Sequence, residues 1–319
     1  MMYVYALVGF VLLFGGGEFL VRGAVAVSSR FGLSPLLVGM TVVAWCTSAP
    51  ELVVSMGAAL AGRSDIAVGN VVGSNIFNVL GVIGAAALIA PIVVDRRGLR
   101  RDTAVMFAAS AALVAISFTG VIGRIAGVIL FAGVIAYVAF SYRAEKSAPS
   151  SPEAILHEHE AEEIEGPKSA WAGLGYLAAG LAALVVGSQF LVTGATDIAR
   201  LLGVSEAVIG LTLVAVGTSL PELATSVVAA MRRHSDVAVG NVVGSNIFNI
   251  LGILGLTAMV RPIGVAEQIV RMDNLVMIGV AIMLSVLLLA RGKVGRIAGA
   301  GFLALYVAYL VVQFSGMAA

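Results

Sequence analysis

The chain contains one long sequence twice. Residues 65–84 read DIAVGNVVGSNIFNVLGVIG and residues 236–255 read DVAVGNVVGSNIFNILGILG, with 16 of the 20 positions identical. The same displacement of 171 residues places TSAPE at 47–51 over TSLPE at 218–222. A repeat at one fixed offset indicates that a single structural unit is present in two copies. The fold must therefore accommodate the same polar motifs twice.

The composition places both copies in a membrane. Hydrophobic residues make up 60% of the 319 residues, charged residues only 12%, and the mean hydropathy is +1.05, whereas about a quarter of the residues in soluble domains are charged. A bilayer core of about 30 Å needs roughly 20 apolar residues per helix. The sequence predicts an all-α membrane protein with ten transmembrane helices, at residues 3–21, 33–61, 67–90, 103–121, 124–142, 171–193, 204–230, 237–260, 274–290 and 296–313.

The basic residues predict the orientation of these helices. When the loops are numbered in order, the odd loops hold 14 Lys and Arg residues and the even loops hold five. Because loops rich in Lys and Arg stay in the cytoplasm, the odd loops are predicted to be cytoplasmic and both termini extracytoplasmic. Five spans per copy is an odd number, so the two copies have opposite orientations. Inverted repeats with interrupted helices are typical of alternating-access transporters that bind substrate at the membrane midplane.

Three regions follow from this division: a first five-helix repeat at 1–142, a polar linker at 143–168 and a second five-helix repeat at 169–319. The cytoplasmic linker holds seven of the 18 acidic residues and two of the three histidines. Its HEHEAEE segment at 157–163 could ligate a divalent ion, since imidazole and carboxylate both bind metals. A solvated, mobile charge run is the simpler interpretation of the same composition.

Each repeat places a carboxylate inside an apolar span. Glu51 and Glu222 follow Pro50 and Pro221 in the TSxPE motifs, and an ionisable group at this depth needs a partner. Neither motif contains a basic residue, so a bound cation or proton is expected to neutralise the glutamates. The prolines interrupt the helical hydrogen bonds, and we expect free carbonyls around Ala44 and Ala215.

The neighbouring spans add further oxygens. A spacing of four residues places Thr47 with Glu51, and Ser74 with Asn78, on common helix faces. Gly69, Gly73, Gly240 and Gly244 form GxxxG patterns, which pack helices closely. We predict a cage of two carboxylates, two amide oxygens, up to six hydroxyls and backbone carbonyls, contributed by Thr47, Ser48, Glu51, Ser74, Asn78, Ala44, Thr218, Ser219, Glu222, Ser245, Asn249 and Ala215.

Such a cage suits hard cations. Calcium accepts six to eight oxygen ligands in flexible geometry, while zinc and copper favour imidazole and thiolate. Carboxylates and carbonyls also coordinate sodium, so two cargoes that share these ligands would displace one another. No resident cofactor is expected; the predicted ligands are transported calcium and sodium, with protons as an alternative.

The paired motifs TSxPE and GNVVGSNIFN resemble the alpha repeats of the sodium/calcium exchanger family, within the calcium/cation antiporter superfamily. The resemblance covers all ten predicted spans and implies that Glu51 and Glu222 are the central ligands. It also implies a prokaryotic calcium/sodium antiporter in the plasma or inner membrane, and a monomer is compatible with this interpretation.

Two positions depart from the family pattern. Cys46 stands where the second copy has Gly217, and Asn249 stands where many family members carry an aspartate. The missing carboxylate leaves the counter-ion open, so proton-coupled calcium exchange is the main alternative. A cation channel is disfavoured because symmetrical filters usually come from several subunits around a pore. An intramembrane hydrolase is disfavoured because no metal-binding His motif or paired nucleophile is present, and we do not expect an enzyme.

Three further acids have structural interpretations. Glu18 lies four residues before Arg22, which predicts an ion pair at the membrane interface. Asp65 and Asp236 open their helices, where the helix dipole favours a carboxylate, although an ion-attracting vestibule would use the same charges.

Overall fold

The computed structural model describes residues 1–94, 96–147, 169–202 and 215–317. The first half contains α1 (Met2–Phe31), α2 (Pro35–Val38), η1 (Gly39–Val43), α3 (Ala44–Thr47), α4 (Ala49–Leu60), α5 (Ser64–Phe77), η2 (Asn78–Ile83), α6 (Gly84–Ile89), β1 (Ile92–Val93), α7 (Arg96–Ser117), β2 (Val121–Ile122) and α8 (Arg124–Ser147). The second half contains α10 (Ala170–Leu201), α12 (Ala215–Thr218), α13 (Leu220–Met231), α14 (Ser235–Ile247), η4 (Phe248–Leu254), α15 (Gly255–Val260), β3 (Ile263–Gly264), η5 (Ile269–Asp273), α16 (Asn274–Arg291), β4 (Lys293–Val294) and α17 (Arg296–Met317). The elements η1, η2, η4 and η5 are short π-helical stretches within longer helices.

The helices are those of a multi-pass membrane protein. Within the described residues, seven helices are long and apolar enough to cross a bilayer, and a bent pair at 36–60 makes an eighth. The helix α7 overlaps the span predicted at residues 103–121, and its first turns carry four arginines. The first part of the span predicted at 204–230, and most of the linker at 143–168, lie outside the described residues.

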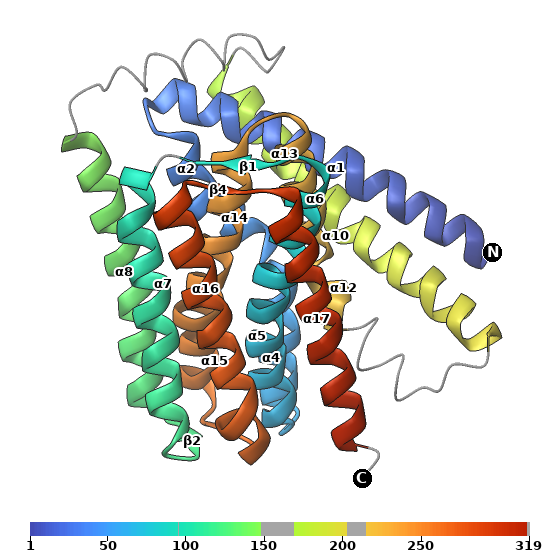
Figure 1. Cartoon of the computed structure of the whole chain (residues 1–319), viewed down its shortest axis with the longest axis vertical. Coiled ribbons are helices and arrows are strands. Elements are labelled where there is room, and N and C mark those ends of the chain that lie inside the picture. Colours follow the sequence, from blue (N-terminus) through green and yellow to red (C-terminus); the bar gives the residue numbers. More distant parts are fainter. Residues whose placement is uncertain (95, 148–168, 203–214, 318–319) are drawn as a thin grey trace.

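Two helices, α1 and α10, lie side by side and run obliquely across the other helices (Figure 1). They contain 30 and 32 residues, which at 1.5 Å per residue is about 45 Å, longer than the bilayer core is thick. Glycines recur every seventh residue along their contact, at 9, 16 and 23 on α1 and at 173, 180, 187 and 194 on α10. A Cβ atom added at Gly180 would lie only 2.6 Å from the backbone nitrogen of Leu20. The two backbones therefore touch, as small residues allow within membranes.

The core is built from the two copies of the duplicated sequence. The helices at 64–89 and 235–260 have 78% and 89% of their most apolar 18 residues buried inside the protein. Around them pack α7 against α16, α8 against α15 and α17 against α6. The duplicated sequence therefore forms the centre of the molecule. This burial explains why most of its residues, apart from the polar residues of the motif, are apolar.

The GxxxG glycines of the two halves differ in how closely other helices pack against them. A Cβ atom at Gly240 would lie 2.8 Å from the carbonyl oxygen of Leu36, and Gly244 packs equally tightly against Met40, so the predicted close packing is confirmed there. Gly69 and Gly73 have nothing within 4 Å among the described residues. The segment of the second half that matches 36–43 lies at 207–214, outside the described residues.

Short strands in the loops between helices form two separate antiparallel pairs. The strand β1 pairs with β4, and β2 pairs with β3, both antiparallel. The backbone N–H of Val93 also donates to Ser235 Oγ at 3.1 Å, and Arg261 donates to the carbonyl of Leu60 at 2.7 Å. In the predicted loop numbering, each of these contacts joins two odd loops or two even loops, with Leu60 and Val121 at the span ends that lead into even loops.

Candidate functional site

The site begins at a break in the helix that carries TSAPE. The helices on either side of Ser48 are bent by 44°, and Ser48 itself has φ −82° and ψ 5°. Ser219 has the same conformation at the matching break, with φ −92° and ψ 10°. These interruptions confirm the broken helices that the prolines predicted. They also separate Thr47 from Glu51, so the expected single helix face is wrong: Thr47 ends α3 and Glu51 lies in α4.

The two glutamates lie in the first turns of α4 and α13 and are fully buried. A helix N-terminus carries partial positive charge, which favours a carboxylate there. Each carboxylate is held by a serine from the opposite half: Ser48 Oγ donates to Glu222 Oε1 at 3.0 Å, and Ser219 Oγ donates to Glu51 Oε1 at 2.7 Å. The structure therefore places each carboxylate against the helix break of the opposite half.

Serines from the duplicated segment complete this layer. Ser74 Oγ lies 3.4 Å from Glu51 Oε1 and 3.1 Å from Ser219 Oγ. Its counterpart Ser245 is fully buried, and its hydroxyl oxygen has no hydrogen-bond partner among the described residues.

Within the described part of the chain, five buried side-chain oxygens of the predicted cage have no hydrogen-bond partner. They are Glu51 Oε2, Glu222 Oε2, Asn78 Oδ1, Asn249 Oδ1 and Ser245 Oγ. Buried polar atoms are normally hydrogen-bonded, so a group of unpartnered oxygens indicates a place where a ligand can bind. Asn78 and Asn249 begin or lie within the π-helical stretches η2 and η4, and such stretches are frequent at functional sites.

The threonines contact asparagines that were not predicted as part of the site. Thr47 Oγ1 lies 3.0 Å from Asn241 Oδ1, and Thr218 Oγ1 lies 3.5 Å from Asn70 Oδ1. The amide of Asn241 in turn donates to the backbone carbonyl of Glu222 at 3.3 Å. A signal was present in the sequence, because Asn70 lies four residues before Ser74 and therefore on the same helix face.

The predicted carbonyls differ between the halves. The Ala44 carbonyl accepts from Ser48 N at 3.0 Å and from Thr47 Oγ1 at 3.3 Å, so the expectation that it is free is wrong. A proline removes the donor for the carbonyl four residues earlier, which is Cys46 rather than Ala44. In the second half, Ser219 N donates to Val216 instead of Ala215.

The carbonyl left by Pro221 is that of Gly217, and Ser188 Oγ from α10 donates to it. A side chain from another helix thus replaces the missing proline N–H, as membrane helices with proline require. The equivalent residue on α1 is Gly17, which has no hydroxyl to offer Cys46.

The donor set of the site is hard oxygen. Among the described residues, no group of three or more His, Cys, Asp or Glu side chains could hold a metal ion. A cation held here would have the two carboxylates and the surrounding amide and hydroxyl oxygens as its ligands. Carboxylate, amide and carbonyl oxygens are the ligands of calcium.

Three acids outside the predicted cage, Glu18, Asp65 and Asp236, are not fully buried. Glu18 Oε1 lies 2.7 Å from Arg22, which confirms the predicted pair, and 2.7 Å from Arg232, which was not predicted. Asp65 and Asp236 lie in the first turns of α5 and α14, as predicted.

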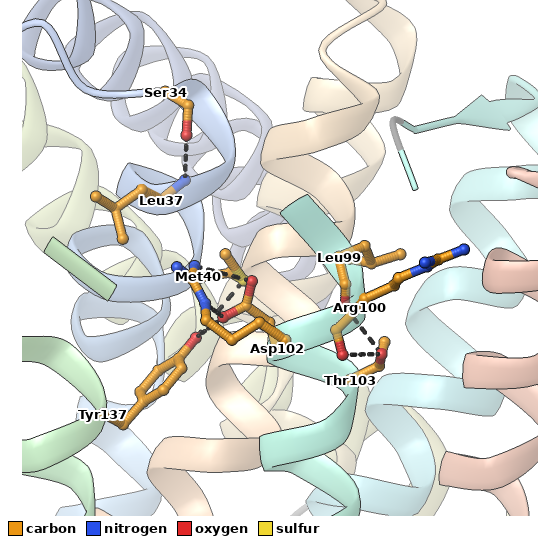
Figure 2. A network of polar contacts seen from close by, with 9 residues as sticks. Ser34, Leu37, Met40, Leu99, Arg100, Asp102, Thr103 and Tyr137 are labelled. Carbon is orange, nitrogen blue, oxygen red and sulfur yellow. Dashed lines mark hydrogen bonds and ion pairs between the residues drawn. The ribbon is translucent and has the colours of Figure 1, made fainter. Parts of the chain in front are cut away.

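Asp102 was not identified as a buried acid by the sequence analysis. It is fully buried, receives a hydrogen bond from Tyr137 at 3.1 Å and pairs with Arg101 at 2.9 Å. Figure 2 shows Tyr137 directed at Asp102, with Met40 of η1 beside it. The second half has a related pair, in which Tyr309 donates to Asp273 at 3.1 Å. Both acids have protein partners, unlike the outer oxygens of the glutamates.

The chain is similar to known proteins over almost its whole length. The family model described as sodium/calcium exchanger protein matches residues 1–143 and 172–315. The putative antiporter CaxA of Alkalimonas amylolytica is 36% identical over 98% of both chains. The sodium/calcium exchanger MaX1 of Methanosarcina acetivorans is 33% identical over 98% of both chains.

Solved structures match over the same extent. A structure of the sodium-calcium exchanger NCX_Mj soaked with 10 mM Na+ and 10 mM Sr2+ has a TM-score of 0.82 and 32% sequence identity, and the match covers 97% of both chains. Both halves of the present chain, including the duplicated motifs around the two glutamates, fall within the matched residues. The chain therefore belongs to the sodium/calcium exchanger family and is a multi-pass cation/calcium antiporter.

Proposed function

We propose that this protein exchanges calcium for sodium by alternating access, at an all-oxygen site near the membrane midplane. The observation that carries the proposal is the group of five buried, unpartnered oxygens from both halves, two of which belong to carboxylates. The proposed ligands are the side chains of the predicted cage, with Glu51 and Glu222 at its centre. In the described part of the chain, both glutamates have hydroxyl partners and no ion-pair partner, so bound cations would supply the compensating charge.

Exchange follows from shared ligands. A doubly negative site is balanced by one calcium ion or by several monovalent ions, so sodium and calcium would compete for the same oxygens. An empty site with two unneutralised carboxylates is costly in a low-dielectric environment, which would oppose its movement across the membrane. MaX1 is named a sodium/calcium exchanger, and NCX_Mj was soaked with sodium together with strontium or calcium, which supports the same pair of cargoes here.

We further propose ten spans in two inverted five-helix repeats, with residues 1–142 and 169–319 as the repeats and both termini extracytoplasmic. The sorting of loop contacts into odd and even sets supports this topology, because each set would lie on one side of the bilayer. The two segments of the family match, 1–143 and 172–315, support the division. The proposed location is the plasma or inner membrane of a prokaryote.

The test is calcium uptake into proteoliposomes under separately imposed sodium, potassium and proton gradients. An outward sodium gradient should drive uptake, and reversing that gradient should reverse the flux. If the sodium gradient has no effect, sodium coupling is wrong.

The glutamates are tested in the same assay. Glu51→Gln and Glu222→Gln should each abolish uptake, because each removes half of the charge that compensates calcium. Glu267→Gln is the matched control, because Glu267 is an exposed acid with 73% of its side chain accessible. Normal uptake by either cage variant would exclude these glutamates as ligands.

Proton-coupled calcium exchange is the second candidate. Asn249 stands where many family members carry an aspartate, and its amide donates to Asn75 at 2.9 Å, so Glu51 and Glu222 are the two acids of the proposed cage. Uptake driven by a proton gradient in the absence of sodium would favour this alternative.

A further inference from the structure

Four buried asparagines link the two halves behind the proposed cation ligands. Asn75 and Asn246 are the inner pair, and Asn78 and Asn249 are the outer pair that belongs to the cage. All four are at most 3% exposed. The inner residues were not identified by sequence analysis, and nothing in the proposed mechanism yet uses them.

The inner pair is held in one orientation. Asn75 Nδ2 donates to the backbone carbonyl of Asn246 at 3.2 Å, and Asn246 Nδ2 donates to the backbone carbonyl of Asn75 at 3.4 Å. The same nitrogens also lie 3.8 Å from the sulfur atoms of Met277 and Met106. An amide nitrogen has two donor hydrogens, and both have acceptors here. Rotating either amide by 180° would break these contacts.

The inner oxygens then orient the outer amides across the boundary between the halves. Asn249 Nδ2 donates to Asn75 Oδ1 at 2.9 Å, and Asn78 Nδ2 donates to Asn246 Oδ1 at 3.1 Å. With the nitrogens turned toward the inner pair, Asn78 Oδ1 and Asn249 Oδ1 are the atoms left buried and unpartnered.

We propose that Asn75 and Asn246 are positioning residues that direct the amide oxygens of Asn249 and Asn78 toward the transported cation. Each inner asparagine acts on the ligand of the opposite half, and each requires a hydrogen-bond donor at that ligand position. This inference rests on the proposed function, because it assigns a role relative to the same cation site.

Double-mutant cycles in the proteoliposome assay test this crosswise pairing. Calcium uptake is driven by whichever gradient supports the unmodified protein, and the apparent KM and Vmax are measured for alanine variants. Loss of one such hydrogen bond should raise the apparent KM about tenfold, with a smaller effect on Vmax.

The pairing predicts which effects combine. Asn75→Ala with Asn249→Ala should raise the KM about as much as either single change, because both remove the same interaction. Asn75→Ala with Asn78→Ala should give nearly the product of the single effects, about a hundredfold. The reverse is expected for Asn246, whose effect should overlap with that of Asn78 and multiply with that of Asn249.

The proposal is overturned if the effects of Asn75→Ala and Asn249→Ala on the KM multiply. It is also overturned if every pair of changes is equally non-additive, because that result indicates a general loss of structure. If Asn75→Ala cannot be purified, Asn75→Leu repeats the cycle with the side-chain volume retained. Inactive Glu51→Gln together with independent Asn75 and Asn249 effects would reject the positioning role and leave the proposed function intact. Active Glu51→Gln would reject the function itself.

Discussion

The hydroxyl of Ser48 donates to Glu222 across the boundary between the two halves, at 3.0 Å. The reciprocal bond joins Ser219 to Glu51 at 2.7 Å. Each carboxylate is thus carried by one copy of the motif and oriented by the other. Neither half can build the site alone, although each contains every residue type that the site needs.

Replacing Ser219 with alanine should weaken calcium binding. Ser219 contacts both Glu51 and Ser74, and a hydrogen bond to a charged group contributes about 1.5–3 kcal/mol, so we expect the apparent KM for calcium uptake to rise at least tenfold. Ser110→Ala is the control, since Ser110 is buried and, among the described residues, its hydroxyl donates only to the carbonyl of Met106 in its own helix. Equal KM values for the two variants would contradict the role of Ser219.

Asn249→Asp should change the counter-ion dependence. A carboxylate at this position places an acceptor against Asn75 Oδ1, where an amide now donates at 2.9 Å, and adds a third acid to the cage. We expect altered dependence of calcium uptake on pH or on sodium, measured by titrating each separately. Gln268→Glu is the control, because it makes the same amide-to-acid change at an exposed position. Unchanged dependence on both ions would show that residue 249 does not face the cation.

Gly180→Ala should destabilise the contact between α1 and α10. The added Cβ would lie 2.6 Å from Leu20 N and 2.8 Å from Gly16 O, and overpacking of this kind costs about 1–3 kcal/mol. The measurement is the melting temperature of the purified protein in detergent. Gly175 lies on the same helix, and a Cβ added there has no described atom within 4 Å. Gly175→Ala should therefore have the same melting temperature as the unmodified protein. Similar melting of both variants would argue against close backbone contact.

Tyr137→Phe should lower stability without removing a cation ligand. The change leaves the buried Asp102 without the hydroxyl that donates to it at 3.1 Å, a loss of about 1.5–3 kcal/mol. Unfolding in detergent should show the difference, while the apparent KM for calcium should stay close to normal. Tyr3→Phe, at a side chain that is 65% exposed, should have no effect. A large change in calcium KM would instead connect Asp102 to the transport site.

The duplicated motifs and the hydropathy were sufficient to predict the membrane class, the interrupted helices and a polar site around Glu51 and Glu222. These features depend on residue type and on spacing within one segment, because an apolar run of sufficient length must span and a proline must interrupt a helix. The pair of Glu18 with Arg22 was predictable for the same reason, since a spacing of four residues brings side chains together on a helix.

The tertiary structure decided the relationships between different helices, which join residues from 29 positions apart, in Ser188 and Gly217, to 194 positions apart, in Thr47 and Asn241. The crosswise hydrogen bonds of Asn75 and Asn246, the contact of Thr47 with Asn241 and the bond from Ser188 to Gly217 all depend on how the helices pack, which spacing within a single segment does not specify. The Ala44 carbonyl, by contrast, is occupied by local donors, the backbone N–H of Ser48 and the hydroxyl of Thr47. The sequence by itself determined which oxygens were available, and the association of the two halves determined which of them remain free to bind a cation.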